Sequence, residues 1–258
     1  MDLGLTDHVA IVTGASRGIG RGIALRLADE GCHLAICARG EEALNETAQE
    51  IEDRGVECLA LPLDMTDKNA PARLVDEAAE RFGRIDILVG NVGGNRRGQF
   101  EELSDEDWDA IIDLNFKSHI RTSRAAIPHM RDAGGGSICY ITSIFGRELG
   151  GAGLSTYNST KSALISLSKV MAQELTPEGV RVNSVAPGSI RFPGGSWDRR
   201  MKEQPEEMKS FIADNLPIGR FGRVGEVADT VAFLVSERAS LITGACLNVD
   251  GGQSHSLI

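Results

Sequence analysis

The stretch HVAIVTGASRGIG, residues 8–20, joins a short apolar run to a glycine-rich turn. The apolar run is typical of a β-strand, and Gly14, Gly18 and Gly20 stand where the chain must turn tightly and begin a helix. Glycine has no Cβ, so the backbone can approach a pyrophosphate closely while the free N–H groups of the new helix face the anion. The glycine spacing differs from the common G-x-G-x-x-G fingerprint of dinucleotide-binding proteins. A glycine-rich turn alone is therefore weak evidence for dinucleotide binding.

Similar apolar runs recur along the whole chain, as CHLAICA from Cys32, VECLAL from Val56, IDILVGN from Ile85, GSICYITS, VRVNSVAP and CLNVD. Runs that are apolar at nearly every position are typical of strands covered on both faces, and the amphipathic stretches between them are long enough for crossover helices. We therefore predict an α/β fold with a doubly wound parallel sheet. No linker or repeat interrupts the alternation, so we expect one domain over residues 1–258.

Residues 189–222, SIRFPGGSWDRRMKEQPEEMKSFIADNLPIGRFG, interrupt the strand pattern. They combine several Gly and Pro residues and dense charge with only a short helical pattern. We interpret them as a mobile substrate lid, and a solvated surface excursion is the alternative. Residues 94–100, GNRRGQF, are interpreted as a second loop. We expect these two loops to select the substrate.

Composition narrows the class of protein. Hydrophobic residues make up 41% of the 258, which is enough for a sizeable core. A net charge of -10 argues against nucleic-acid or anionic-membrane partners, which need clustered Lys and Arg. No apolar run approaches the ~18 residues of a membrane span, and no basic region precedes an apolar core near Met1, so we expect a cytoplasmic protein. The five cysteines and five histidines lack zinc-site spacing, which predicts reduced thiols and no metal.

The end of the second predicted strand bears on cofactor choice. NAD-binding folds place an acid there, on the ribose 2′-hydroxyl, but this chain has Ala38 and Arg39. A guanidinium at Arg39, with Arg17 in the glycine turn, suits the 2′-phosphate of NADP(H) because its forked donors match phosphate oxygens. Either arginine could instead be an ordinary solvated charge.

Tyr157 and Lys161 lie in a helical pattern, STYNSTKSALISLSKVMAQEL, four residues apart and therefore on one face. A free phenol has a pKa of about 10, and a nearby ammonium lowers it. Lys161 would thus make Tyr157 a usable acid/base catalyst. The alternative is an ordinary surface pair, which many helices carry.

Two further polar residues are candidates for the site. Ser143 follows the strand SICYIT, and ligands of parallel sheets collect beyond the carboxyl ends of strands, so its hydroxyl could hold a substrate oxygen. A turn-forming serine is the alternative. Asn115 shares a helix face with Trp108 and Ile111 and must find polar partners there. The Asn115 side chain could pair with neighbouring backbone groups or hold a water molecule, and the sequence allows both roles.

The motifs TGASRGIG, GNVGG, Asn115, Ser143, YNSTK and VAPG, in this order, together resemble the short-chain dehydrogenase/reductase family in its short single-domain form. The resemblance spans nearly the whole chain and leans toward 3-oxoacyl-(acyl-carrier-protein) reductases. It implies a Rossmann-like sheet of seven strands and a homotetramer. It also implies that Tyr157 exchanges a proton, Ser143 orients the carbonyl oxygen, Lys161 binds the nicotinamide ribose and Asn115 sustains a water relay.

The resemblance further implies the cofactor contacts. The glycine turn would meet the pyrophosphate, and the residues after the following strands would meet the adenosine and nicotinamide halves. The full expected set is Gly14, Ser16, Arg17, Gly18, Ile19, Gly20, Arg39, Asp64, Met65, Asn91, Val92, Gly93, Tyr157, Lys161, Pro187, Gly188 and Ile190. Two departures stand out, since Gly90 replaces the first of two asparagines usual in the family and Phe192 stands where a threonine is frequent. We therefore expect the backbone at Ile190 to hold the nicotinamide.

These observations predict an NADP(H)-dependent oxidoreductase that interconverts a ketone, with 3-oxoacyl thioesters among the candidates, and a secondary alcohol. A cofactor-sensing binding protein without turnover is the alternative, and the intact set of Asn115, Ser143, Tyr157 and Lys161 counts against it. A serine hydrolase is less favoured still, because Ser143 lies in no G-x-S-x-G elbow.

Overall fold

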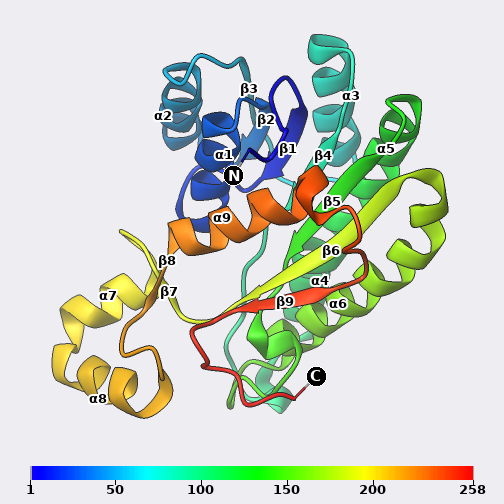
Figure 1. The fold of residues 1–258 in the computed structure, drawn as a ribbon. Coiled ribbons are helices and arrows are strands. Elements are labelled where there is room, and N and C mark those ends of the chain that lie inside the picture. The colour runs from blue at the N-terminus through cyan, green and yellow to red at the C-terminus, as the bar shows by residue number, and fades with distance from the viewer. Residues whose placement is uncertain (1, 258) are drawn as a thin grey trace.

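A single parallel sheet forms the centre of the protein in a computed structural model that describes residues 2–257 (Figure 1). Its seven strands lie in the order β3-β2-β1-β4-β5-β6-β9, and every neighbouring pair is parallel. Because the order runs outward in both directions from β1 and β4, the predicted doubly wound, seven-stranded, Rossmann-like fold is confirmed. The strands are β1 (Val9–Thr13), β2 (His33–Ala38), β3 (Cys58–Pro62), β4 (Ile87–Gly90), β5 (Gly136–Ile141), β6 (Val180–Pro187) and β9 (Cys246–Val249).

Helices cover both faces of the sheet, which makes a three-layer domain. Along β1 the side chains alternate, so that Ala10 and Val12 enter one apolar core while Ile11 enters the other. The first core is closed by α1 (Gly18–Asp29), α2 (Glu41–Glu52) and α9 (Val224–Val235), and the second by α3 (Ala70–Phe82), α5 (Ser118–Asp132) and α6 (Ser155–Leu175). The helix α4 (Asp105–Ile112) precedes a π-helical turn, η2 (Asp113–Lys117). Short 3-10 turns lie at η1 (Phe100–Glu102), η3 (Ile144–Gly146), η4 (Thr176–Glu178) and η5 (Glu237–Ala239).

The segment 189–222 is more ordered than its sequence indicates. It contains α7 (Ser196–Glu203) and α8 (Pro205–Asn215) between the paired short strands β7 (Ile190–Arg191) and β8 (Gly222–Arg223). The ring of Trp197 lies 4.8 Å from Phe211 and 5.1 Å from Phe221, centroid to centroid, beside the buried Met208. The expectation of a loop with only a short helical pattern is therefore wrong, because its apolar side chains pack on one another in a small cluster, whereas its role as a substrate lid stays a prediction. Figure 1 shows α7 and α8 beside the main body.

The carboxyl ends of the strands lie along one edge of the sheet, and this edge gathers the predicted site residues. Parallel strands all end on the same side, so the segments after β1, β2, β3, β4, β5 and β6 meet there. Among the helices of residues 2–257, none is both long and apolar enough to span a bilayer.

Candidate active site

The glycine turn after β1 has the backbone conformation that its sequence predicts. Gly14 and Gly18 adopt φ angles of 69° and 57°, which side chains other than hydrogen rarely tolerate. A Cβ at Gly20 would lie 2.3 Å from the carbonyl oxygen of Gly14, so α1 begins directly on the turn. Within the described part of the chain, no side chain caps the N–H groups of the first turn of α1. These N–H groups therefore suit an anion such as a pyrophosphate.

Asn91 and Thr13 brace this turn from behind. The Asn91 amide nitrogen donates hydrogen bonds to the carbonyl oxygens of Thr13 and Gly14, both at 3.0 Å. The Thr13 hydroxyl oxygen accepts from the N–H groups of Asn91 at 3.0 Å and Val92 at 3.2 Å. The Asn91 side chain thus joins the ends of β1 and β4. Thr13 was missed by the sequence reasoning, although a hydroxyl at the last strand position before a glycine turn was a usable signal.

A groove of about 470 Å³ runs along the carboxyl edge of the sheet. It brings together most of the predicted cofactor contacts, and its lining also includes Phe192 and Leu114, which were not predicted to bind the cofactor. Gly18 adjoins it, because a Cβ there would lie 2.8 Å from the Phe192 ring. The predicted residues that line it are Gly14, Ser16, Arg17, Ile19, Gly20, Arg39, Asp64, Met65, Asn91, Val92 and Gly93.

One end of this groove is cationic. Arg17 and Arg39 line it, both exposed, and no acid stands at the end of β2. The nearby Asp64 carboxylate has a lowered pKa, first because the Thr66 N–H donates to it and also because of the Thr66 hydroxyl and the charge of Arg39. The two guanidinium groups supply the donors that a ribose 2′-phosphate requires. The donor set and the glycine turn therefore fit a dinucleotide.

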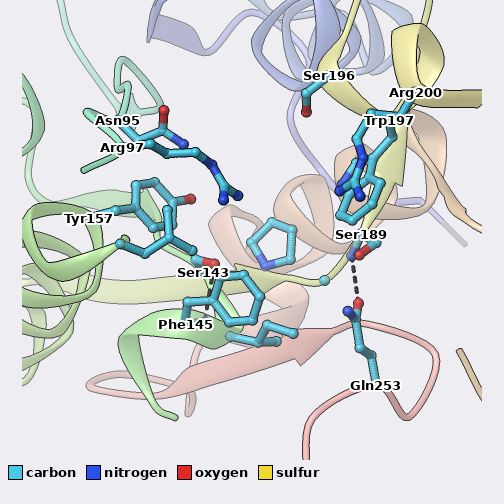
Figure 2. A pocket seen from close by; sticks show the side chains of 14 residues that line it. Asn95, Arg97, Ser143, Phe145, Tyr157, Ser189, Ser196, Trp197, Arg200 and Gln253 are labelled. Carbon is cyan, nitrogen blue, oxygen red and sulfur yellow. Dashed lines mark hydrogen bonds between the residues drawn. The ribbon is translucent and has the colours of Figure 1, made fainter. Parts of the chain in front are cut away.

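A second cleft, of about 460 Å³, contains the predicted catalytic serine and tyrosine (Figure 2). Ser143 follows β5 and caps η3, where its hydroxyl oxygen accepts from the Phe145 N–H at 3.2 Å. Tyr157 lies in the first turn of α6 and lines the same cleft as Ser143. The predicted Pro187 and Gly188 line the same cleft at the end of β6. The cleft thus presents two hydroxyl groups to one ligand.

Burial dominates the proton affinities of Tyr157 and Lys161. It raises the pKa of Tyr157 above its ordinary value, while the hydrogen bond from Ser143 lowers it. Burial also lowers the pKa of Lys161 to about 8. The Lys161 ammonium lies 5.8 Å from the centroid of the Tyr157 ring and donates to the carbonyl oxygen of Ile141 at 2.8 Å. In this arrangement desolvation raises the pKa of Tyr157, and the expected lowering of that pKa by Lys161 stays a prediction.

Asn115 occupies the π-helical turn η2 and is fully buried. Its carbonyl oxygen accepts from the Gly94 N–H at 2.8 Å, and its amide nitrogen donates to the Gly94 carbonyl at 2.9 Å and the Thr160 hydroxyl at 3.0 Å. Asn115 therefore ties the loop after β4 to α6. A Cβ at Gly93 would lie 3.3 Å from the Asn115 carbonyl oxygen and 3.4 Å from the Lys161 nitrogen. Gly93 is thus where the nucleotide groove meets the catalytic group, and Thr160 is a partner that the sequence reasoning missed.

Gly90 is explained by a histidine that the sequence reasoning left unassigned. A Cβ at Gly90 would lie 2.7 Å from both His119 Nδ1 and a ring carbon of Tyr140. His119 is buried, and its Nε2 contacts the Val92 carbonyl oxygen at 3.0 Å. Burial, followed by the charge of Lys161, lowers the pKa of His119 to about 3. His119 is therefore neutral, and it positions the loop that lines the nucleotide groove.

The side chain of the predicted residue Ile190 does not reach the cleft. It is buried in β7 and packs on Gly222, where a Cβ would lie 2.4 Å from Ile190 Cδ1. The side chain lines a separate cavity beside Leu216 and Val249. The expected contact through the Ile190 backbone stays a prediction. Several cleft residues were not predicted individually, because they come from remote segments, namely Asn95, Arg97, Trp197, Arg200 and Gln253.

Comparison with known proteins agrees with this site. Residues 14–254 match the family described as enoyl-(acyl carrier protein) reductase. The chain is 36% identical over 244 residues to the 3-oxoacyl-(acyl-carrier-protein) reductase FabG of Staphylococcus aureus, covering 94% of this chain and 96% of that relative. The L-sorbose reductase of Gluconobacter frateurii, complexed with NADPH and L-sorbose, superposes with a TM-score of 0.94 at 34% identity, covering 100% of each chain. A 7α-hydroxysteroid dehydrogenase complexed with NADH and 7-oxo glycochenodeoxycholic acid gives a TM-score of 0.91 at 32% identity, covering 100% of this chain and 98% of the other.

The chain belongs to the short-chain dehydrogenase/reductase family. It is therefore an oxidoreductase that uses a nicotinamide cofactor, and the glycine turn, the nucleotide groove and the adjoining cleft correspond to that chemistry.

Proposed function

We propose that this protein is an NADP(H)-dependent oxidoreductase that interconverts a ketone and a secondary alcohol, with 3-oxoacyl thioesters as one candidate substrate class. The pair Ser143 and Tyr157, which lines one cleft beside a nucleotide groove, carries the proposal. A pyrophosphate would lie on the glycine turn, and the nicotinamide would lie near Pro187 and Gly188. When bound, the cofactor supplies or accepts the hydride.

The protein's own residues would handle the proton. In reduction, Ser143 donates a hydrogen bond to the carbonyl oxygen, and Tyr157 transfers its hydroxyl proton to that oxygen as the carbon becomes a secondary alcohol. Because burial raises the pKa of Tyr157, its phenol is protonated at neutral pH and ready to donate. In the oxidative direction the alcohol returns this proton to the phenolate. We assign Lys161 to the nicotinamide ribose and Asn115 to the support of a water relay.

The preference for NADP(H) rests on Arg39 and Arg17. Relatives bind either nicotinamide cofactor, since the sorbose reductase structure contains NADPH and the hydroxysteroid dehydrogenase structure NADH. The supporting observation is therefore local, namely two guanidinium groups in the groove and Ala38 where an acid would favour NAD(H).

Replacing Tyr157 by Phe tests the proposed function. Turnover of a panel of ketones and acyl thioesters should fall by several orders of magnitude, while NADPH binding, followed by fluorescence, should stay nearly unchanged. Tyr140→Phe is the matched control, because Tyr140 is the other tyrosine of the chain and its hydroxyl contacts Ser123 and Met171 inside the core. Turnover near the original level in Tyr157→Phe would exclude the mechanism. A protein that binds NADPH and reduces nothing in the panel would favour the cofactor-sensing alternative.

We further propose a homotetramer in the cytoplasm. Exposed apolar side chains support an assembly, with Val170 on α6 47% exposed and Leu247 on the edge strand β9 43% exposed. The five cysteines are all free thiols, as expected in a reducing compartment. Light scattering on the purified protein would distinguish a tetramer from smaller species.

A further inference from the structure

The substrate cleft differs in charge from the rest of the protein. Asp and Glu outnumber Lys and Arg by 37 to 27 in the whole chain, yet two arginines and no acidic residue line this cleft. Arg97 comes from the loop between β4 and α4, and Arg200 comes from α7. Figure 2 shows them on opposite walls, with the guanidinium of Arg97 pointing into the space beside Tyr157. The cleft therefore has a local positive charge that the net charge conceals.

Arg97 is available to a ligand. Within residues 2–257 no hydrogen bond or ion pair holds its guanidinium, whereas the adjacent Arg96 is paired with Asp107 at 3.3 Å. Arg97 thus offers all five N–H donors of its planar fork. Of the two neighbouring arginines, Arg96 is therefore engaged by an acid while Arg97 lines the cleft.

Arg200 is held in place on the opposite wall. Its guanidinium carbon lies 5.1 Å from the centroid of the Trp197 ring, and its Nη2 donates to Glu207 at 3.1 Å. Stacking on an aromatic ring orients the guanidinium plane. The bond to Glu207 uses one donor, so the remaining donors can serve a second partner.

We propose, on the basis of the proposed ketone and alcohol chemistry, that the substrate carries an anionic group, a carboxylate or a phosphate, and that Arg97 binds it with help from Arg200. Ser143 and Tyr157 hold the reacting oxygen in the same cleft, so the anion fixes the other end of the substrate. A guanidinium matches carboxylate and phosphate oxygens with two parallel donors. Anchoring both ends orients the carbonyl carbon and so contributes to the rate as well as to binding.

The test compares charged and neutral forms of one skeleton. Acetoacetate, 4-oxopentanoate and 5-oxohexanoate are each assayed beside their methyl esters, and acetoacetyl-CoA beside acetoacetyl-N-acetylcysteamine, with NADPH and with NADH. We expect kcat/KM for at least one anionic member to exceed that for its neutral partner by roughly ten- to a hundredfold, the effect of one charge-assisted contact. Arg97→Gln should abolish this preference by lowering kcat/KM for the anionic member far more than for its neutral partner, and it should leave the KM for NADPH unchanged. Arg200→Gln should reduce it partly, and the matched control Arg96→Gln should leave it intact.

The substrate pairs identify the source of the anion. A preference confined to the oxo acids identifies a substrate carboxylate, and one confined to the coenzyme A thioester identifies a carrier phosphate. Equal kcat/KM for charged and neutral members, or a preference that survives Arg97→Gln, would overturn the inference and leave the proposed function standing.

If no compound is reduced, isothermal calorimetry of the same oxo acids and esters tests the anion site separately from the proposed reaction. Oxo acid binding that is lost in Arg97→Gln would keep the anion site and remove the proposed reaction. If the oxo acid and its ester bind equally well, or if neither of them binds, the anion site itself would be overturned.

Discussion

Replacing His119 by Gln should remove much of the protein's sensitivity to mild acid. His119 is buried against Gly90 and Tyr140, and burial lowers its pKa from 6.5 to about 3. The folded protein therefore excludes a proton that the unfolded chain binds below pH 6.5. A lowered folded-state pKa gives stability that is present above the unfolded pKa and lost as the pH falls toward the folded value. Glutamine stays neutral throughout and keeps an N–H donor for the Val92 carbonyl.

The size of the effect follows from this shift. Each pH unit between 6.5 and the folded pKa costs about 1.4 kcal/mol, so lowering the pH from 7 to 5 should cost the original protein about 2 kcal/mol through His119 alone. Other titrating groups contribute to both proteins and cancel in the comparison. His119→Gln should therefore lose about 2 kcal/mol less free energy of unfolding over this interval.

Urea unfolding at pH 7, 6 and 5, followed by tryptophan fluorescence at one protein concentration, measures this difference. His255→Gln is the control, because His255 is exposed near the end of the chain. The reasoning would be refuted if the original protein and His119→Gln lost the same free energy of unfolding between pH 7 and pH 5. A loss for His255→Gln that differs from that of the original protein would show that the buried site is not the cause.

Two further predictions concern the cofactor. The double change Ala38→Asp with Arg39→Leu removes a phosphate ligand and adds a carboxylate. The ratio of kcat/KM for NADPH to kcat/KM for NADH should therefore fall by at least ten- to a hundredfold. An unchanged ratio would mean that these two positions do not select the cofactor. In the original protein we expect NADPH binding to weaken as the pH rises through about 8, because the lowered pKa of Lys161 causes its charge to be lost there. Lys161→Ala should weaken NADPH binding at pH 7 and remove this pH dependence. Titrations of NADPH fluorescence from pH 6 to 9 measure this, and a parallel decline in both proteins would exclude Lys161 as the titrating group.

Local sequence patterns were sufficient for the fold and for much of the candidate site. Seven apolar runs became the seven strands of one sheet, because a strand buried on both faces must be apolar at nearly every position. The glycines of the turn after β1 were predictable since positive φ angles there exclude side chains. Tyr157 and Lys161 shared a helix face through spacing alone. Each of these features depends on residues close together in the chain.

Other features were decided by contacts between remote segments. Trp197, Phe211 and Phe221 turn residues 189–222 into a small helical unit, although local charge and glycine content indicated a loop. Gly90 acquired a reason only when α5 placed His119 against it. No local pattern shows such packing.

The electrostatics of the site were also decided by the tertiary structure. Spacing predicted that Lys161 would lower the pKa of Tyr157, but the surrounding chain removes water from both side chains, and desolvation raises the pKa of Tyr157. Arg97 and Arg200 face each other across one cleft although β5, β6 and β7 separate them in the sequence. The sequence alone determined the strands, the glycine turn and the candidate catalytic set, because these depend on local geometry. Solvent exclusion and the meeting of distant charges depend on how the whole chain packs, and only the tertiary structure decides them.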